Sequence, residues 1–167
     1  MVVLTGNGKG KSSSAFGMLA RSVGHGLRSG VVQFIKGTWD CGEQKLFQHH
    51  KLVDFFVMAT GFTWETQDRE ADIVAAESTW QHAAALLSDP DVDVVILDEL
   101  TYMLTYGYLD KEMVLQAIES RPPAQHVVVT GRNASTELIE MADTVSEVGE
   151  TKHAFYEGVK VQRGIDY

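Results

Sequence analysis

A glycine-rich stretch near the start of the chain, Gly6-Asn7-Gly8-Lys9-Gly10-Lys11-Ser12, carries residue types that bind phosphate. The phosphate-loop pattern is Gly, four residues, then Gly-Lys-Ser/Thr; Gly10-Lys11-Ser12 matches its end, whereas Thr5 holds the position of the first glycine. Closely spaced glycines let backbone N–H groups turn toward an anion, and the helix that follows adds its positive end. The stretch therefore predicts a loop that grips the triphosphate of ATP. A plain glycine turn between a strand and a helix is the alternative.

Within this stretch we assign separate roles to the lysine and the serine. Lys11 supplies a point charge to the phosphates, and the Ser12 hydroxyl binds a divalent cation. The residues expected to contact the nucleotide are Gly6, Asn7, Gly8, Lys9, Gly10, Lys11, Ser12 and Ser13.

An acidic pair, Asp98-Glu99, closes the apolar run at residues 92–97. Ionised carboxylates at the end of a buried strand are costly unless they are paired or bind a metal, so the pair predicts a Mg²⁺ role. The alternative for one of the two is that it merely caps the next element. The pair alone does not separate ATP hydrolysis from other triphosphate chemistry.

Apolar runs and helical spacing predict the elements that position these residues. Strands are expected at residues 1–5, 31–35, 52–57, 92–97, 126–130 and 144–148, and helices at about 12–27, 69–88, 110–120 and 135–142. Gly30 is expected to interrupt the pattern, residues 37–50 to be irregular, and residues 149–167 to be loop with one short strand at most. Because strands alternate with helices, we predict a three-layer α/β/α domain of the P-loop NTPase-like (RecA-like) kind with a mostly parallel sheet.

Length and composition limit the class of protein. The 167 residues fit one domain spanning 1–167, and a net charge of −9 argues against a nucleic-acid surface. A single cysteine, Cys41, excludes an internal disulfide. No apolar run is long enough to span a bilayer, and the first residues lack signal-peptide features, so we expect a soluble cytoplasmic protein without a membrane partner.

Four motifs in order give the chain a resemblance to a known family. Besides the glycine loop, they are Val32-Gln33-Phe34-Ile35-Lys36-Gly37-Thr38-Trp39, Gly61-Phe62-Thr63-Trp64-Glu65-Thr66 and Leu97-Asp98-Glu99-Leu100-Thr101-Tyr102. The chain resembles a corrinoid adenosyltransferase of the phosphate-loop type, and matching segments run from Val3 to Tyr167. The resemblance implies transfer of the 5′-deoxyadenosyl group of ATP to the cobalt of a reduced Co(I) corrinoid, with release of triphosphate, in adenosylcobalamin biosynthesis or salvage.

The resemblance also implies roles for individual residues. Ser12 and Glu99 become the expected ligands of Mg²⁺ (or Mn²⁺), with Asp98 as the reserve. Gly61, Phe62 and Trp64 become the corrinoid-binding residues, with the two aromatic rings against the lower face of the corrinoid, where they displace the axial ligand of cobalt; core packing is their alternative role. The expected catalytic residues are then Lys11, Phe62, Trp64 and Glu99.

Partners are implied in the same way. Members of the family suggest a homodimer, a flavodoxin-like or other reductase as electron donor, and an N-terminal helical segment over the corrinoid, which we expect this chain to lack. Two other functions stay open on the residues alone: an ATP hydrolase or small-molecule kinase, and a corrinoid-binding module that uses nucleotide as a regulator. Cys41 is expected to be a bystander thiol, and Arg132 to be either a ligand contact or a solvated surface residue.

Overall fold

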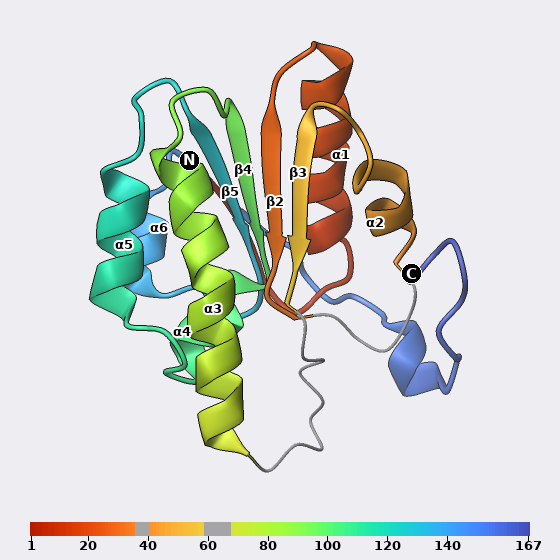
Figure 1. Cartoon of the computed structure of the whole chain (residues 1–167). Coiled ribbons are helices and arrows are strands. Elements are labelled where there is room, and N and C mark those ends of the chain that lie inside the picture. Colours follow the sequence, from red (N-terminus) through yellow and green to blue (C-terminus); the bar gives the residue numbers. More distant parts are fainter. Residues whose placement is uncertain (36–40, 59–67) are drawn as a thin grey trace.

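The computed structural model describes residues 1–35, 41–58 and 68–167 and contains one six-stranded sheet (Figure 1). Its strands are β1 (Val2–Thr5), β2 (Ser29–Gln33), β3 (Val53–Val57), β4 (Val94–Asp98), β5 (His126–Thr130) and β6 (Thr144–Glu147). They lie in the order β3-β2-β4-β5-β1-β6, and every pairing is parallel. The helices are α1 (Lys11–Gly24), α2 (Gly42–Phe47), α3 (Arg69–Ser88), α4 (Leu100–Thr105), α5 (Lys111–Glu119) and α6 (Thr136–Met141), followed by a 3₁₀ turn, Ala154–Glu157.

Helices cover both faces of the sheet, which confirms the predicted α/β fold. Helices α1 and α2 lie on one face, and α3, α4, α5 and α6 lie on the other (Figure 1). Successive residues of a strand point to opposite faces, and so Val31 packs with α1 whereas Val32 packs with α3. The sequences of the buried strands are therefore continuous apolar runs, because the side chains of each strand pack into two separate cores, one on each face of the sheet.

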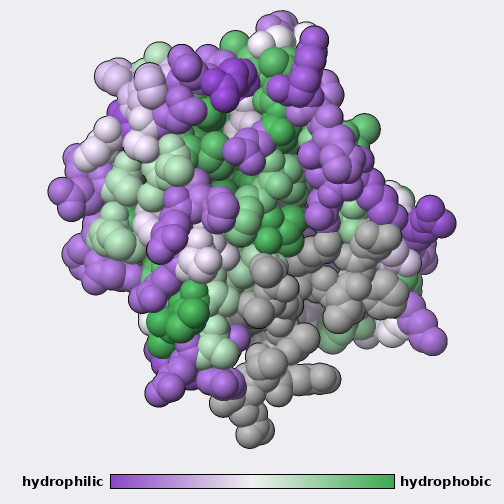
Figure 2. Space-filling view, in the orientation of Figure 1, coloured by the Kyte–Doolittle hydropathy of each residue, from purple (hydrophilic) through white to green (hydrophobic). Residues whose placement is uncertain are grey.

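Hydrophilic residues cover most of the outer surface of the flanking helices, and apolar residues are visible between them in the upper middle of the molecule (Figure 2). This view has the orientation of Figure 1, in which the edge strand β3 faces the viewer. Four of the five side chains of β3 are half-buried because one side of this strand has no neighbour in the sheet.

Parallel pairing decides where the polar ends of the strands meet. The carboxyl ends of β1, β2 and β4 lie at the same edge of the sheet, and the pairing sets Gln33 beside Asp98. The glycine loop follows β1 at this edge and leads directly into α1, which begins at Lys11. Ligands of open parallel sheets bind outside this edge, so the topology alone locates the candidate site.

Two helices were missed from the sequence. Residues 37–50 contain a helix, α2, whose Phe47 is buried against the α1 core; residues 36–40 lie outside the described ranges. The acidic pair is followed at once by α4, a helix of six residues that no apolar period had indicated. The tail agrees with the expected loop: residues 149–167, all of which are described, contain a 3₁₀ turn and no strand.

Gly30 was expected to interrupt the pattern but lies inside β2, which begins at Ser29, two residues before the predicted start at residue 31. It pairs with Asp54 on one side and Val95 on the other. A Cβ atom built at Gly30 would lie 2.6 Å from Cδ1 of Leu86 on α3. Glycine is therefore needed here because α3 packs closely on the strand.

We expect Gly30→Ala to destabilise the protein by about 1–3 kcal/mol, because the added methyl group overlaps the Leu86 side chain. Chemical denaturation measures the change. Gly17→Ala is the matched control: Gly17 lies in α1 with open space around its Cβ position, so this variant should gain up to about 1 kcal/mol from helix propensity. Shortening Leu86 to alanine should cost less in the Gly30→Ala background than in the wild type, and equal costs would contradict the close contact.

Candidate active site

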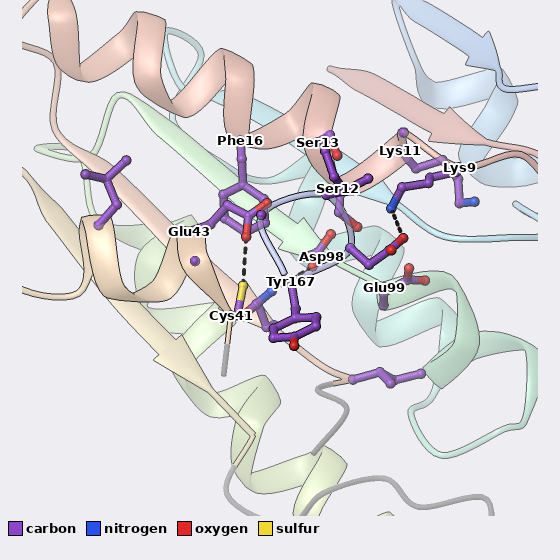
Figure 3. A pocket seen from close by; sticks show the side chains of 18 residues that line it. Lys9, Lys11, Ser12, Ser13, Phe16, Cys41, Glu43, Asp98, Glu99 and Tyr167 are labelled. Carbon is purple, nitrogen blue, oxygen red and sulfur yellow. Dashed lines mark hydrogen bonds and ion pairs between the residues drawn. The ribbon is translucent and has the colours of Figure 1, made fainter. Parts of the chain in front are cut away.

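A cavity of about 520 Å³ opens at the carboxyl edge of the sheet (Figure 3). The glycine loop and the first turn of α1 form one wall, the ends of β2 and β4 form the floor, and α2 and residues 164–167 close the remaining sides. Figure 3 shows Lys9, Lys11 and Glu99 at one end of the cavity, and Phe16, Cys41 and Glu43 at the other. The cavity therefore has a charged end next to the glycine loop and a more apolar end next to α2.

The shape of the glycine loop depends on contact with the segment after β6. Gly8 N–H donates to the carbonyl of Val148 at 2.8 Å, and a Cβ atom at Gly8 would lie 2.3 Å from the carbonyl oxygen of Gly149. Gly6 has φ +97°, and its Cβ position lies 2.5 Å from the carbonyl oxygen of Val148. Both glycines are thus required by close backbone packing, in addition to any role in binding phosphate.

Thr5, which replaces the first glycine of the phosphate-loop pattern, is a buried residue of β1. Its hydroxyl oxygen accepts a hydrogen bond from Ala134 N–H at 3.2 Å. Thr5 therefore acts as a strand residue whose hydroxyl group binds the backbone of Ala134.

Lys11 is 7% exposed, and its ammonium group donates to the carbonyl of Gly8 at 2.9 Å. Burial lowers the pKa of Lys11, and the negative charge of Glu99 is the main opposing influence. The lysine thus lies inside the loop, close to the acidic pair, where an added anion would stabilise its charged form.

Asp98 is fully buried at the end of β4, and both of its carboxylate oxygens accept hydrogen bonds. Gln33 Nε2 donates to Oδ2 at 3.0 Å, and the Thr130 hydroxyl donates to Oδ1 at 2.7 Å. Burial raises the pKa of Asp98, while hydrogen bonds from Gln33, Thr130 and Ser12 act in the opposite direction. These bonds hold the carboxylate in one orientation beside Ser12.

Glu99 has an unfavourable backbone conformation and an unsatisfied side chain. Its φ of +60° is in the left-handed region, and its N–H donates to the Thr130 hydroxyl oxygen at 2.9 Å. Among the described residues, nothing donates a hydrogen bond to its buried Oε2 atom. Burial and then the negative charge of Asp98 raise the pKa of Glu99 to about 7, against the opposing charges of Lys11 and Arg132. Strain and an orphaned buried oxygen at one residue are typical of a functional position.

The structure brings most of the sequence-predicted residues together. Lys9, Gly10, Lys11, Ser12, Ser13, Asp98 and Glu99 all line the cavity. Gly6, Asn7 and Gly8 belong to the same loop but are not part of the cavity wall. Gly61, Phe62 and Trp64 lie outside the described residues, as do Lys36 and Trp39.

Sequence reasoning gave no role to several residues of this site. Gln33 and Thr130 hold Asp98, and a polar residue at the end of an apolar strand was the only signal for either. Residues 164–167 also line the cavity, where Asp166 pairs with Lys9 at 2.8 Å. Cys41 lines it too; its thiol donates to Glu43 at 2.9 Å, and burial raises its pKa, which keeps it protonated and a poor nucleophile.

The donor set around Ser12, Asp98 and Glu99 consists of hard oxygen atoms, the type that Mg²⁺ prefers. In the ranges 1–35, 41–58 and 68–167 there is no group of three His, Cys, Asp or Glu side chains that could hold a metal ion by themselves. A cation here would therefore need oxygen atoms from Ser12 and from a substrate, as Mg²⁺ does in phosphate-loop proteins.

Comparison with known proteins decides the family. A family model described as ATP:corrinoid adenosyltransferase BtuR/CobO/CobP matches residues 1–167. The chain belongs to this family. It is 57% identical over 167 residues to corrinoid adenosyltransferase CobA of Salmonella typhimurium (strain LT2), covering all of this chain and 85% of that protein. The corrinoid adenosyltransferases of Escherichia coli (strain K12) and a Sinorhizobium species are 56% and 44% identical, with 85% and 79% of their lengths covered.

Membership of the ATP:corrinoid adenosyltransferase family confirms the resemblance seen in the four motifs. The protein is an enzyme whose substrates are ATP and a corrinoid, and adenosyl transfer replaces ATP hydrolysis and small-molecule phosphorylation as its chemistry. Among the described helices, none has both the length and the apolar character needed to cross a membrane.

We expect Glu99→Gln to stabilise the ligand-free adenosyltransferase at pH 8 by about 1–3 kcal/mol. The folded protein holds a proton on Glu99 up to a pKa of about 7, whereas the unfolded chain releases it near the ordinary value of 4.5. Wild-type stability therefore falls as the pH rises from about 4.5 through 7, and the variant lacks this loss.

Thermal or urea unfolding at several pH values measures the effect. The difference between the variant and the wild type should grow with pH across this window and stay constant above it. Glu77→Gln, at an exposed position of α3, is the control and should change stability little at any pH. A Glu99→Gln effect that does not depend on pH would contradict the buried, raised-pKa carboxylate.

Proposed function

We propose that the charged end of the cavity binds the triphosphate of ATP as a leaving group, while a reduced corrinoid takes the adenosyl group. The observation that supports this most strongly is the meeting of the glycine loop and the acidic pair in one cavity, with Glu99 Oε2 buried and unsatisfied. The cation of a cation–triphosphate complex would supply the positive charge that this oxygen lacks. Lys11 and the N–H groups at the start of α1 bind the phosphate oxygens.

The reaction is a displacement at carbon. Cobalt in the Co(I) state supplies an electron pair to the ribose C5′ atom, and the bond between C5′ and the triphosphate oxygen breaks. The electrons of that bond leave with the triphosphate, so negative charge grows on the phosphate closest to C5′. Lys11 and the loop amides stabilise this charge, an electrostatic effect often worth several kcal/mol in enzymes.

The cation in this scheme is Mg²⁺ or Mn²⁺, held by Ser12 and Glu99. Asp98 is the less suitable direct ligand because both of its oxygens already accept hydrogen bonds from Gln33 and Thr130. We assign Asp98 to orienting Ser12 and to balancing the charge of the cation from a second layer. When bound, the cation neutralises charge on the departing triphosphate.

The corrinoid-binding roles of Gly61, Phe62 and Trp64 rest on the family resemblance. The described strand before their segment supports the assignment: Val57, at the end of β3, is paired with Gln33, which lines the cavity. β3 therefore ends at the edge of the sheet where we propose that ATP binds. Aromatic rings on the lower face of the corrinoid cannot donate to cobalt, which makes reduction of four-coordinate Co(II) easier.

Several further assignments come with the family. We propose that residues 1–167 act as one domain, that the enzyme works as a homodimer in the cytoplasm, and that a flavodoxin-like or other reductase supplies the electron. Abundant ATP and a reducing environment suit a Co(I) nucleophile. Complete cobalamin and incomplete corrinoids are both suitable substrates for this chemistry.

The reaction is tested by supplying MgATP with chemically reduced corrinoid. Triphosphate and the cobalt–carbon bond should form in equal amounts, because a single displacement yields both. Lys11→Ala should lower kcat/KM by at least about a hundredfold, since it removes charge stabilisation from the leaving group. Gly17→Ala, at a position that does not line the cavity and has open space around its Cβ, should retain full activity. Formation of ADP and phosphate without a cobalt–carbon bond would contradict the proposal.

The aromatic residues are tested separately. We expect Phe62→Ala and Trp64→Ala to lower the rate of Co(II) corrinoid reduction by at least about tenfold. The dissociation constant for ATP should stay within about twofold of the wild-type value. The electronic spectrum of the Co(II) corrinoid with protein and MgATP should lose its four-coordinate signature in each variant. Equal loss of ATP binding and of reduction would indicate a folding defect and would remove the support for a lower-face role.

A further inference from the structure

Gln33 is a buried polar residue of the active-site cavity to which the reaction described above gives no direct role. It is the last residue of β2, it is 6% exposed, and its Cα is paired with that of Asp98 on the neighbouring strand. Its side chain lines the cavity together with Ser12 and Glu99.

The orientation of the Gln33 amide is fixed by its neighbour. An ionised Asp98 only accepts hydrogen bonds, so the NH₂ group must face it, and Nε2 donates to Oδ2 at 3.0 Å. The amide oxygen Oε1 then points away from Asp98. Oε1 is buried and, among the described residues, receives no hydrogen bond. An unsatisfied buried acceptor is costly, and a donor from a ligand would recover that cost.

Among the described residues, no side chain donates to this oxygen. Asp98 and Glu43 add negative charge to this part of the cavity, and the Ser12 hydroxyl is hydrogen-bonded to Asp98. The ammonium of Lys11 donates to Gly8, and the hydroxyl of Thr130 donates to Asp98. A bare phosphate oxygen is also an acceptor and would be repelled by Oε1. The partner that fits is a neutral O–H group carried in by the substrate complex.

We propose that Gln33 is a positioning residue that acts on two sides: Nε2 holds Asp98, and Oε1 accepts a hydrogen bond from an O–H group of the bound cation–ATP complex. The O–H group belongs either to a water molecule on the cation or to a ribose hydroxyl of ATP. This inference rests on the proposed binding of cation–ATP in the cavity. Gln33 thereby contacts the substrate complex from the β2 side of the cavity, opposite the glycine loop.

Gln125 provides a matched control within the same chain. It is also buried, at 3% exposure, and its Oε1 also lacks a partner among the described residues. Its Nε2, however, donates to the backbone carbonyls of Leu86 and Val92, and it precedes β5, at the opposite end of the sheet from the cavity. The two glutamines thus share burial and an orphaned oxygen but differ in contact with the cavity.

The test compares Gln33→Met with Gln125→Met, each of which removes both polar groups and keeps the side-chain length. Electron paramagnetic resonance of free Mn²⁺ measures its binding to the protein with ATP, with 2′-deoxy-ATP and 3′-deoxy-ATP, and with inorganic triphosphate. We expect about tenfold weaker Mn²⁺–ATP binding for Gln33→Met and no change for Gln125→Met. The KM for ATP should rise by a similar factor, with a smaller change in kcat.

The different ligands separate the two sources of the O–H group. A similar loss of affinity with inorganic triphosphate would support a cation-bound water. A loss with ATP that disappears with one of the deoxy analogues would support the ribose hydroxyl. Should Gln33→Met not fold, Gln33→Asn keeps the amide but shortens its reach by one methylene, and at least threefold weaker binding is expected.

Two results would overturn the inference: unchanged Mn²⁺–ATP binding in the Gln33 variant that folds, or equal weakening in Gln125→Met. A wild-type protein that fails to bind Mn²⁺ with either ATP or triphosphate would instead contradict the proposed function, so the two failures are distinguishable.

Discussion

The hydroxyl group of Thr130 is the interaction on which the acidic half of the active site depends. It donates to Asp98 and accepts from the N–H of Glu99, so one side chain of β5 fixes both the last residue of β4 and the acid that follows it. The contact exists because β4 and β5 are parallel neighbours in the sheet. Without it, Asp98 would keep fewer of the bonds that offset its burial, and the left-handed turn at Glu99 would lose a fixed anchor.

The acidic pair shows how this enzyme gives up stability for reactivity. Burial raises the pKa of both carboxyl groups, and the negative charge of Asp98 raises the pKa of Glu99 further. In the proposed substrate complex, a cation and Lys11 would neutralise the pair, so that binding energy would offset a cost already present in the free protein.

Much of the sheet could be predicted from the sequence because strands buried on both faces are continuous apolar runs, as at residues 92–97 and 126–130. The glycine loop and the acidic pair were found because their residue types are unusual and their spacing is fixed. The local sequence gives no such signal for Gln33 and Thr130. Their roles depend on which strands are neighbours in the sheet, and no local pattern predicts the strand order. Helices α2 and α4 were missed because their six residues, less than two helical turns, show no apolar period; α6 is equally short and was predicted as a helix.

The packing of Gly8 on Val148 and Gly149 has a consequence for biosynthesis. The glycine loop is made early in translation, but the backbone that shapes it is about 140 residues further along the chain. Residues 6–11 on a ribosome-bound fragment therefore lack the surface that holds them in their binding conformation until β6 and the residues after it have emerged and paired with β1. The binding conformation of the loop thus depends on long-range backbone contacts and not on its own sequence alone.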